Sequence, residues 1–438
     1  MTVIGARPTE DRIRPDQAAP AGRHRVLPPN GEPVDDLRDH LDQYGAPPYR
    51  GSPGQLIRGI HAAGLTGRGG ADFPTAAKMS AVMSSGLPAV AVANGAEGEL
   101  ASQKDKLLLW YSPHLVLDGL QLAAEAIGAD RAYVYVPRLR YLTDKLHATL
   151  TARMSAGIDR LPAHVVHSPQ RFLAGEESAL VSRIEGGPAL PRFKPPRVFE
   201  RGVDGAPTLV QNVETLAHLA LIARYGPAWF RSVGTPDEPG TRLVTQLAPD
   251  GSAAVAEAAL GTPIRDLLTL DRERVRAVLI GGYHGTWIPI GRATDLRFSA
   301  ASAKTVGAAL GAGVLAALPA DRCGLVETAR VVRYLAVESA GQCGPCLNGL
   351  AGIAGALARL SGSGFNPRIR TDLERWAGLT AGRGACKHPD GTVRFVRTAL
   401  RTFSGEITLH QTGRCSATSR EPLLPVRMDG PSDEADWR

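Results

Sequence analysis

The chain has 438 residues, of which 43% are hydrophobic and 21% charged, a composition typical of globular proteins with more than one hydrophobic core. The formal net charge is +7, but basic and acidic residues are interspersed. No run of Lys and Arg interleaved with aromatic residues favours nucleic-acid binding, so the basic bias is better suited to anionic cofactors and an acidic protein partner.

The first 17 residues contain no apolar stretch typical of a secretory signal, and the Ala/Gly-rich residues 306–320 are too few to cross a bilayer. The cysteines form an odd, sparse set that is not a disulfide framework: Cys323, Cys343, Cys346, Cys386 and Cys415. We therefore expect a cytoplasmic protein without direct membrane insertion.

In chain order, residues 1–50 are rich in Pro and Arg and predict an extension that lies on the body, with one weak helix at 35–44. Residues 51–235 alternate helical stretches with short apolar runs. The clearest elements are strands at 89–93 and 132–136 and a helix at 115–127. This alternation predicts an α/β domain with a mostly parallel sheet.

The pattern changes near residue 240. Residues 236–325 predict a small α+β domain with strands at 241–248, 253–260 and 275–282 and a short helix at 262–268. Residues 326–410 predict a four-helix bundle, with helices at 328–338, 347–360, 371–379 and 392–403. Residues 411–438 are polar and predict a disordered tail.

A glycine-rich segment, GRGGADFPTAAKM, occupies residues 67–79. Its glycines let backbone amides approach an anion, and Pro74 and Thr75 open a helix whose N-terminus favours phosphate. Lys78, one turn into that helix, has the charge to neutralise a phosphate or contact a flavin. Many such loops are only turns, so this segment alone does not decide between a phosphate site and a tight loop.

Two further segments carry polar groups. NGAEGELASQKDK, at residues 94–106, follows a predicted strand, where α/β sheets bind ligands. AGEESAL, at 174–180, precedes LPRFKPPRVF and PTLVQNVETL, and its adjacent glutamates either face a ligand or satisfy a helix N-terminus. The amides of Gln211 and Asn212 suit the edge of a heterocycle.

In order and spacing these segments resemble the flavin- and NADH-binding subunit of respiratory complex I and of related NAD-linked hydrogenases and formate dehydrogenases. The resemblance covers residues 51–403. It implies an FMN-binding Rossmann-like α/β domain, then a β-grasp (ubiquitin-like, soluble-ligand-binding) domain, then the helical iron–sulfur bundle.

The resemblance also implies site residues. The FMN site would be lined by Gly67, Gly69, Lys78, Asn94, Glu97, Gly175, Glu176, Gln211 and Asn212. The nucleotide side would be formed by Phe73, Glu99, Glu177 and Lys194. No general acid or base is assigned, because hydride transfer requires none.

The chain departs from the family pattern at several of these positions. Ala96 stands where the family has an acidic residue, and Gln211 where it has Asn. Ala81 and Arg197 replace aromatic residues that stack on the nucleotide. Each lost stacking contact costs on the order of 1 kcal/mol, so we expect weakened NADH binding. Arg197 would stack in place of the ring or favour a phosphorylated nucleotide.

The segment ESAGQCGPCLNG resembles the family's iron–sulfur motif. Cys343, Cys346 and Cys386 match three of its ligands, but the first ligand position is Ala340. Three thiolates hold a [3Fe–4S] cluster, or a [4Fe–4S] cluster whose fourth iron takes another ligand, for which His388 is a candidate. The alternative is a decayed site in a purely structural bundle. Cys323 is expected to be a core thiol and Cys415 incidental.

The sequence thus predicts an FMN-dependent oxidoreductase that passes electrons from NADH to an iron–sulfur centre or to a ferredoxin-like partner, peripheral to a membrane reductase. Two alternatives remain open. In one, the chain is an FMN relay that exchanges electrons with a ferredoxin-like protein and does not use NADH. In the other, it is a non-catalytic scaffold of a redox complex.

Overall fold

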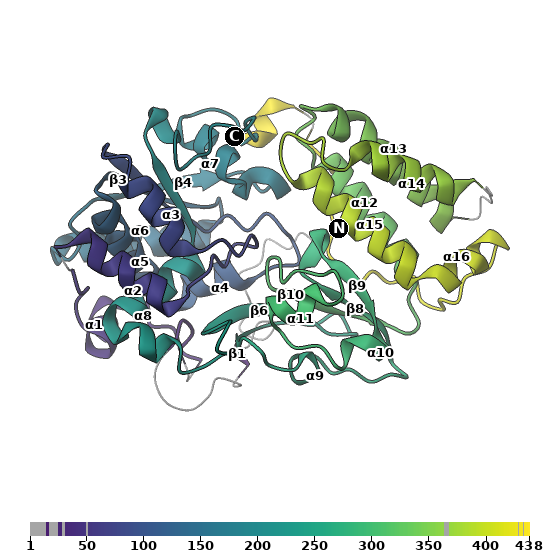
Figure 1. The fold of residues 1–438 in the computed structure, drawn as a ribbon, viewed down its shortest axis with the longest axis horizontal. Coiled ribbons are helices and arrows are strands. Elements are labelled where there is room, and N and C mark those ends of the chain that lie inside the picture. Colours follow the sequence, from purple (N-terminus) through teal and green to yellow (C-terminus); the bar gives the residue numbers. More distant parts are fainter. Residues whose placement is uncertain are drawn as a thin grey trace.

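The computed structural model describes residues 15–16, 25–28, 31–49, 51–362, 368–427, 429–431 and 433–438. Two sheets and a set of C-terminal helices form its three main parts (Figure 1). Expectations for the remaining residues, including most of the N-terminal extension, lie outside the described part of the chain. No helix within the described residues is long and apolar enough to cross a membrane.

The first sheet is parallel, with strand order β4-β3-β2-β5. Its strands are β2 (Ala89–Asn94), β3 (Ala129–Pro137), β4 (Ala163–Ser168) and β5 (Thr208–Asn212). The sequence AVAVAN of β2 is apolar at successive positions because both faces of the sheet are covered. Ala91 faces the larger core beneath the helices, whereas Val90 and Val92 face the core beside α7 (Glu177–Ile184).

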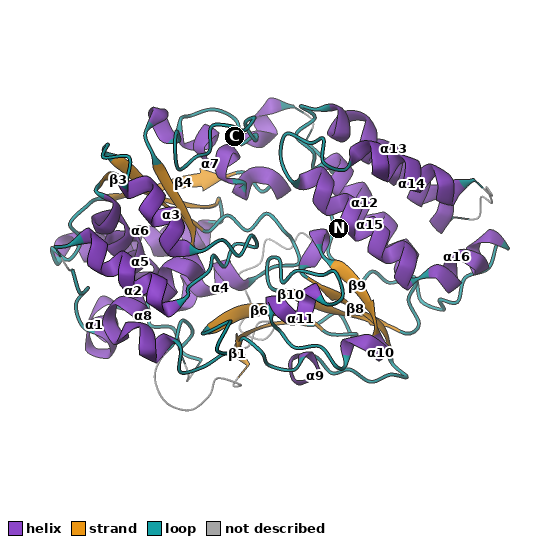
Figure 2. Ribbon diagram, in the orientation of Figure 1, coloured by secondary structure: helices purple, strands orange, loops and turns teal. Residues whose placement is uncertain are grey.

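Helices α5 (Pro113–Ile127) and α8 (Val213–Phe230) pack against each other on one face of this sheet, and α2 (Pro53–Ala63) packs on α8 (Figure 2). The two long helices approach closely because Gly119 has no side chain; a Cβ at this position would overlap the backbone of Leu216. The same part of the molecule contains α1 (Leu37–Tyr44), α3 (Thr75–Met83), α4 (Lys104–Tyr111), α6 (Arg140–Ser155) and the 3₁₀ turns η1 (Phe172–Gly175) and η2 (Val203–Gly205).

The second sheet is mixed, with strand order β1-β7-β6-β10-β8-β9. Strand β6 is antiparallel to β7 and parallel to β10, which is antiparallel to β8. The strands are β1 (Pro15–Asp16), β6 (Thr241–Leu247), β7 (Ala253–Ala259), β8 (Val275–Ile280), β9 (Thr286–Pro289) and β10 (Val314–Pro319). Short helices connect them: α9 (Ile264–Leu267), η3 (Gly282–His284), α10 (Ile290–Ala293) and α11 (Ala300–Lys304).

The C-terminal helices pack on one another beside the second sheet (Figure 2). Helix α12 contacts α13 and α15, and α14 contacts both α13 and α15. They span α12 (Gly324–Val337), a π-helical turn η4 (Pro345–Leu350), α13 (Ala351–Ser361), α14 (Ile369–Thr380), α15 (His388–Thr402) and α16 (Ser404–Gln411).

The expected mixed α/β class with a parallel sheet is confirmed. The expected strands at 89–93, 132–136, 241–248, 253–260 and 275–282 correspond to β2, β3, β6, β7 and β8. The element ends differ by a few residues, as local patterns fix them least well.

The prediction of a disordered tail is wrong for the described residues beyond 411. Leu423 and Leu424 are buried, and their backbone N–H groups donate to the carboxylate of Glu327 on α12. The turn η5 (Glu434–Trp437) buries Trp437, whose carbonyl accepts from the N–H of Ala189 at 2.7 Å. The tail is polar in composition, but its few apolar side chains are buried against segments that are distant in sequence.

Candidate cofactor-binding site

The centre of the candidate site lies where β2 and β5 end. Asn94 and Asn212 are paired across these parallel strands, and the Asn212 amide donates to the Asn94 carbonyl at 3.3 Å. The Asn94 amide donates to the carbonyl of Gly175 at 2.9 Å. Two of the expected blocks therefore meet directly at the carboxyl edge of the sheet, the usual ligand position in such folds.

Next to Asn212, the side-chain amide nitrogen of Gln211 is buried and has no hydrogen-bond partner among the described residues. The hydroxyl of Thr75, at the start of α3, is also buried without a described partner. A buried polar atom without a partner costs on the order of 1–3 kcal/mol. A bound group with acceptor atoms would remove that cost.

The glycine-rich loop joins α2 to α3 and reaches the same edge. Gly69 faces Asn212, because a Cβ built on Gly69 would lie 3.4 Å from the Asn212 Cβ. As expected, Pro74 precedes the first residue of α3, and Lys78 lies one turn into it. Lys78 Nζ donates to the Val210 carbonyl at 3.0 Å, which directs its charge toward the end of β5.

Two lysines and two glutamates form a charged group beside this loop. Lys78 Nζ lies 3.2 Å from Glu177, and Lys194 Nζ lies 3.0 Å from Glu177 and 2.5 Å from Glu176. Burial alone would raise the pKa of Glu177, but the two lysines hold it below its usual value. Glu176 also accepts from the N–H groups of Ser178 and Ala179, so it caps α7 as well as facing the lysine.

Glu97 and Glu99 have different environments although they are two residues apart. Glu97 is engaged at the N-terminus of α4, accepting from the N–H of Asp105 at 3.2 Å and pairing with Lys106 at 3.0 Å. The Glu97 carboxylate, which was expected to line the flavin site, therefore also caps the N-terminus of α4. Glu99 accepts from the N–H of Tyr283 at 3.1 Å, and burial raises its pKa to about 8.

Several residues expected on the nucleotide side are exposed. Phe73 is 52% exposed in the glycine-rich loop, and both Ala81 and Arg197 are exposed. Phe193, which directly precedes Lys194, is 77% exposed and was not among the expected site residues. Its ring is therefore free to contact a ligand beside Lys194, an exposure that the tertiary structure decides.

Sequence reasoning also missed the buried ion cluster behind the asparagines. Lys104 Nζ lies 2.6 Å from Asp105, 2.9 Å from Glu214 and 3.2 Å from Asn212 Oδ1. Glu214 in turn accepts from the N–H of Leu243 on β6 at 2.7 Å. This cluster fixes the orientation of the Asn212 side chain and ties it to the second sheet.

The three expected cluster cysteines come together. Cys343 precedes η4 and its carbonyl accepts from the N–H groups of Cys346 and Leu347, both at 3.0 Å. Burial, followed by the neighbouring thiols Cys343 and Cys386, raises the pKa of Cys346 to about 12. Burial raises the pKa of Cys386, the charge of Glu176 adds to this shift and that of Lys194 opposes it, so Cys386 lies within electrostatic range of the charged group beside the glycine-rich loop. Three grouped thiols at a helix start fit an anionic iron–sulfur cluster.

His388, the expected candidate for the fourth iron, is engaged elsewhere in the fold. His388 is buried at the start of α15, with Nε2 2.8 Å from the Leu335 carbonyl and Nδ1 3.2 Å from His284 Nε2. Because a carbonyl only accepts, His388 Nε2 carries the proton and Nδ1 accepts from His284. Both ring nitrogens are therefore occupied within the fold.

Family comparisons agree with this geometry. Residues 60–221 match the Nuo51 FMN-binding domain, and residues 327–410 match the NADH-ubiquinone oxidoreductase-F iron-sulfur binding region. The second NADH-quinone oxidoreductase F subunit of Rhizobium meliloti (strain 1021) is 30% identical over 392 residues, which are 85% of this chain and 91% of that protein. The NADH-quinone oxidoreductase F subunit of Rhodobacter capsulatus is 31% identical over 390 residues, covering 84% and 90%.

The fold is also similar to a solved structure, the NAD+-reducing [NiFe]-hydrogenase in the H2-reduced state. The TM-score is 0.78 at 27% identity, covering 90% of this chain and 67% of that one. The sequence relatives and the structural neighbour agree with the two family matches. The chain belongs to the family of NADH-quinone oxidoreductase F subunits.

Proposed function

We propose that the chain is an FMN-dependent oxidoreductase subunit that passes electrons from NADH through the flavin to an iron–sulfur centre. The observation that carries this proposal is the convergence of Lys78, Asn94 and Gly175 with Gln211 and Asn212 at the ends of β2 and β5. FMN, when bound, accepts a hydride from the nicotinamide and releases its electrons singly.

In this proposal each residue has a binding role. The backbone of the loop at Gly67 and Gly69, with the N-terminus of α3, holds the flavin phosphate. The unpartnered amide of Gln211 donates to the flavin ring, and Asn94 and Asn212 fix the wall beside it. Lys78 pairs with Glu177, and Lys194 pairs with Glu176 and Glu177. These cations balance the two carboxylates, which otherwise oppose added negative charge near the ring.

The nucleotide is proposed to lie between Phe73, Glu99, Glu177 and Lys194. Phe73 offers an exposed ring for stacking, and Lys194 offers a cation beside the two glutamates. Its affinity is expected to be low, since Ala81 and Arg197 provide no aromatic ring.

We propose an iron–sulfur cluster on Cys343, Cys346 and Cys386. Ala340 has no ligand atom and His388 is hydrogen-bonded on both nitrogens, so the fourth iron takes water or a partner's side chain, or is absent. The charges of Glu176 and Lys194 both influence the pKa of Cys386, which supports a cluster on the same side of the molecule as the flavin site. The acceptor proposed for these electrons is an iron–sulfur or ferredoxin-like partner.

We infer three domains within the described residues: an FMN domain at 51–235, a β-grasp domain at 236–325 and a four-helix iron–sulfur bundle at 326–410. Support for the second is the strand order β7-β6-β10-β8, in which the central pair is parallel and both outer pairs antiparallel. Support for the third is the mutual packing of α12, α13, α14 and α15. We propose a cytoplasmic location, peripheral to a membrane reductase complex.

A second candidate function is an FMN relay that exchanges electrons with a ferredoxin-like protein and does not use NADH. The observation that favours it is the exposed Ala81 and Arg197 on the nucleotide side. Absorbance of the anaerobic purified chain decides between the two. We expect flavin absorbance bands that NADH bleaches. Bands that only a reduced ferredoxin bleaches would support the relay. Absence of any flavin band would support a non-catalytic scaffold.

A further inference from the structure

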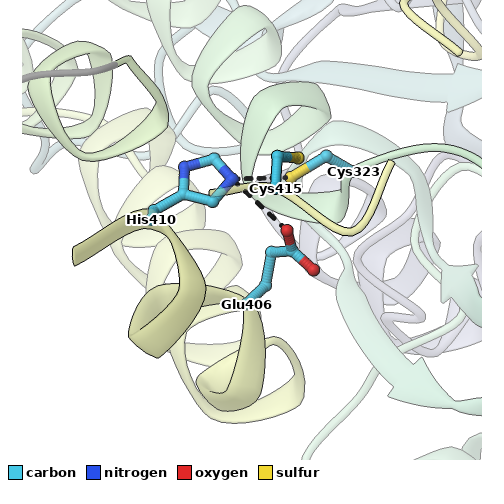
Figure 3. Close-up of side chains that lie close together, drawn as sticks. All are labelled: Cys323, Glu406, His410 and Cys415. Carbon is cyan, nitrogen blue, oxygen red and sulfur yellow. Dashed lines mark hydrogen bonds and ion pairs between the residues drawn. The ribbon is translucent and has the colours of Figure 1, made fainter. Parts of the chain in front are cut away.

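Four potential metal ligands lie close together beside α16, and none of them belongs to the proposed iron–sulfur site (Figure 3). Cys323 immediately precedes α12, Glu406 and His410 lie four residues apart on α16, and Cys415 follows α16. One ligand atom from each lies within 4.8 Å of the other three. Cys323, Glu406 and His410 are buried and Cys415 is exposed, which leaves an entry path for an ion.

The two separations that involve His410 Nε2 match edges of a tetrahedron around zinc. Zinc bonds of about 2.3 Å to sulfur, 2.05 Å to nitrogen and 2.1 Å to oxygen require a sulfur–nitrogen edge of about 3.6 Å and a nitrogen–oxygen edge of about 3.4 Å. Cys323 Sγ and His410 Nε2 are 3.5 Å apart, and His410 Nε2 and Glu406 Oε1 are 3.4 Å apart. The 3.4 Å nitrogen–oxygen distance is longer than a well-formed hydrogen bond, and the 3.5 Å sulfur–nitrogen distance fits a thiol hydrogen bond as well as a shared ion.

The groups behind these side chains orient them as ligands. His410 Nδ1 lies 2.9 Å from the Leu360 carbonyl, which fixes the ring proton on Nδ1 and leaves the Nε2 lone pair facing the two thiols and the carboxylate (Figure 3). Glu406 accepts from the N–H of Ser416 at 2.8 Å and from Arg276 at 3.0 Å. Arg276 offsets the negative charge that two thiolates and a carboxylate would bring together.

We propose that Cys323, Glu406, His410 and Cys415 form a structural Zn²⁺ site, separate from the flavin and iron–sulfur sites. Two thiols with an imidazole and a carboxylate form a donor set that suits zinc better than Mg²⁺ or Ca²⁺. Binding forms two zinc–thiolate bonds and releases the two thiol protons to solvent.

The ion would join two regions that are distant in sequence, the start of α12 and the stretch from α16 to Cys415. It would hold the segment after α16 against the start of α12, where the N–H groups of Thr418 and Ser419 already bond to the Asp321 carbonyl at 2.9 and 3.0 Å. From there the tail continues to Leu423 and Leu424, which bond to Glu327. Zinc would therefore stabilise the tail and the C-terminal helices together, because the unfolded chain lacks a preformed site.

The test uses the full-length chain, which is incubated with ZnSO₄ and then dialysed. Inductively coupled plasma mass spectrometry measures the amount of zinc that stays bound per chain. We expect about one zinc ion per chain at this site. Cys415→Ser should lose it without unfolding, since Cys415 is exposed, and His410→Ala should lose it as well. The matched control is Cys343→Ser/Cys346→Ser/Cys386→Ser, which removes the other grouped thiols and should keep the zinc.

Two readouts independent of activity complete the test. Zinc-edge X-ray absorption should show about two sulfur neighbours near 2.3 Å and about two lighter ones near 2.0–2.1 Å. A chelator should lower the melting temperature of the native chain but not that of Cys415→Ser. Equal zinc content in the native and Cys415→Ser chains, zinc lost only in the triple variant, or a zinc-free chain with a Cys323–Cys415 disulfide would each overturn the proposal.

Discussion

Asn94 and Asn212 face each other across the parallel strands β2 and β5, and the side chain of Asn212 bonds to the backbone of Asn94. The pair marks the carboxyl edge of the first sheet. Gly69 approaches it from the glycine-rich loop, and Gly175 approaches it from the turn before α7. Disturbing any of these approaches should therefore disturb flavin binding before it disturbs the fold.

Gly69→Val is expected to remove most of the bound FMN. The new side chain would enter the space in front of Asn212, where the Cβ alone would already be 3.4 Å from the Asn212 Cβ. We expect at least tenfold weaker FMN binding, about 1.4 kcal/mol, with an unchanged circular dichroism spectrum. Gly59→Val on α2 is the matched control, since a Cβ there meets nothing within 4 Å. Full flavin content in Gly69→Val would place the site elsewhere.

Ala81→Phe/Arg197→Phe should tighten NADH binding by roughly ten- to a hundredfold, because it restores two rings that can stack on the nucleotide. Both native side chains are exposed, so the substitutions should not disturb the core. Stopped-flow flavin reduction across an NADH titration measures the effect, and Ala81→Leu/Arg197→Leu separates stacking from apolar burial. Saturation of the native chain at low micromolar NADH would contradict the expected weak binding.

Ala340→Cys should stabilise a four-iron cluster by supplying a thiolate that the native chain lacks. In the native chain we expect mild oxidation to convert a [4Fe–4S] cluster into a [3Fe–4S] cluster, and added iron to reverse the change. Electron paramagnetic resonance, together with iron and sulfide analysis, measures the two forms. Ala340→Ser, which is similar in size and lacks the thiol, is the control. An iron-free chain after anaerobic reconstitution would show that the three cysteines hold no cluster.

Glu99→Gln should make stability less dependent on pH. The folded pKa of Glu99 is about 8 against 4.5 for an ordinary glutamate, so the folded state binds more protons between these values. The free energy of unfolding of the native chain therefore falls as the pH rises through this window. Relative to it, Glu99→Gln should gain on the order of 1 kcal/mol per pH unit between pH 5 and 8.

Urea unfolding of both chains across that range measures the difference. Glutamine keeps the oxygen that accepts from the Tyr283 N–H, so the substitution removes only the ionisation. Glu374→Gln, on the exposed side of α14, is the control and should show no such trend. A constant difference between the Glu99→Gln and native chains would mean that Glu99 does not titrate in this window.

The sequence by itself determined the elements whose signals are local. The apolar run of β2, the opening of α3 by Pro74 and Thr75, and the spacing of Cys343 and Cys346 all depend on residues close in the chain. Such patterns report hydrophobic burial and backbone constraints directly, so these elements were expected correctly.

Only the tertiary structure decided which partner each polar side chain has. The sequence suggested His388 as an iron ligand. In the structure both of its ring nitrogens bond to residues from distant segments, His284 and Leu335. No role was expected for Cys415, but the fold places its thiol within 4.8 Å of the Cys323 thiol. A side chain's protonation, burial and coordination depend on atoms that long-range folding places beside it, and these cannot be inferred from local periodicity.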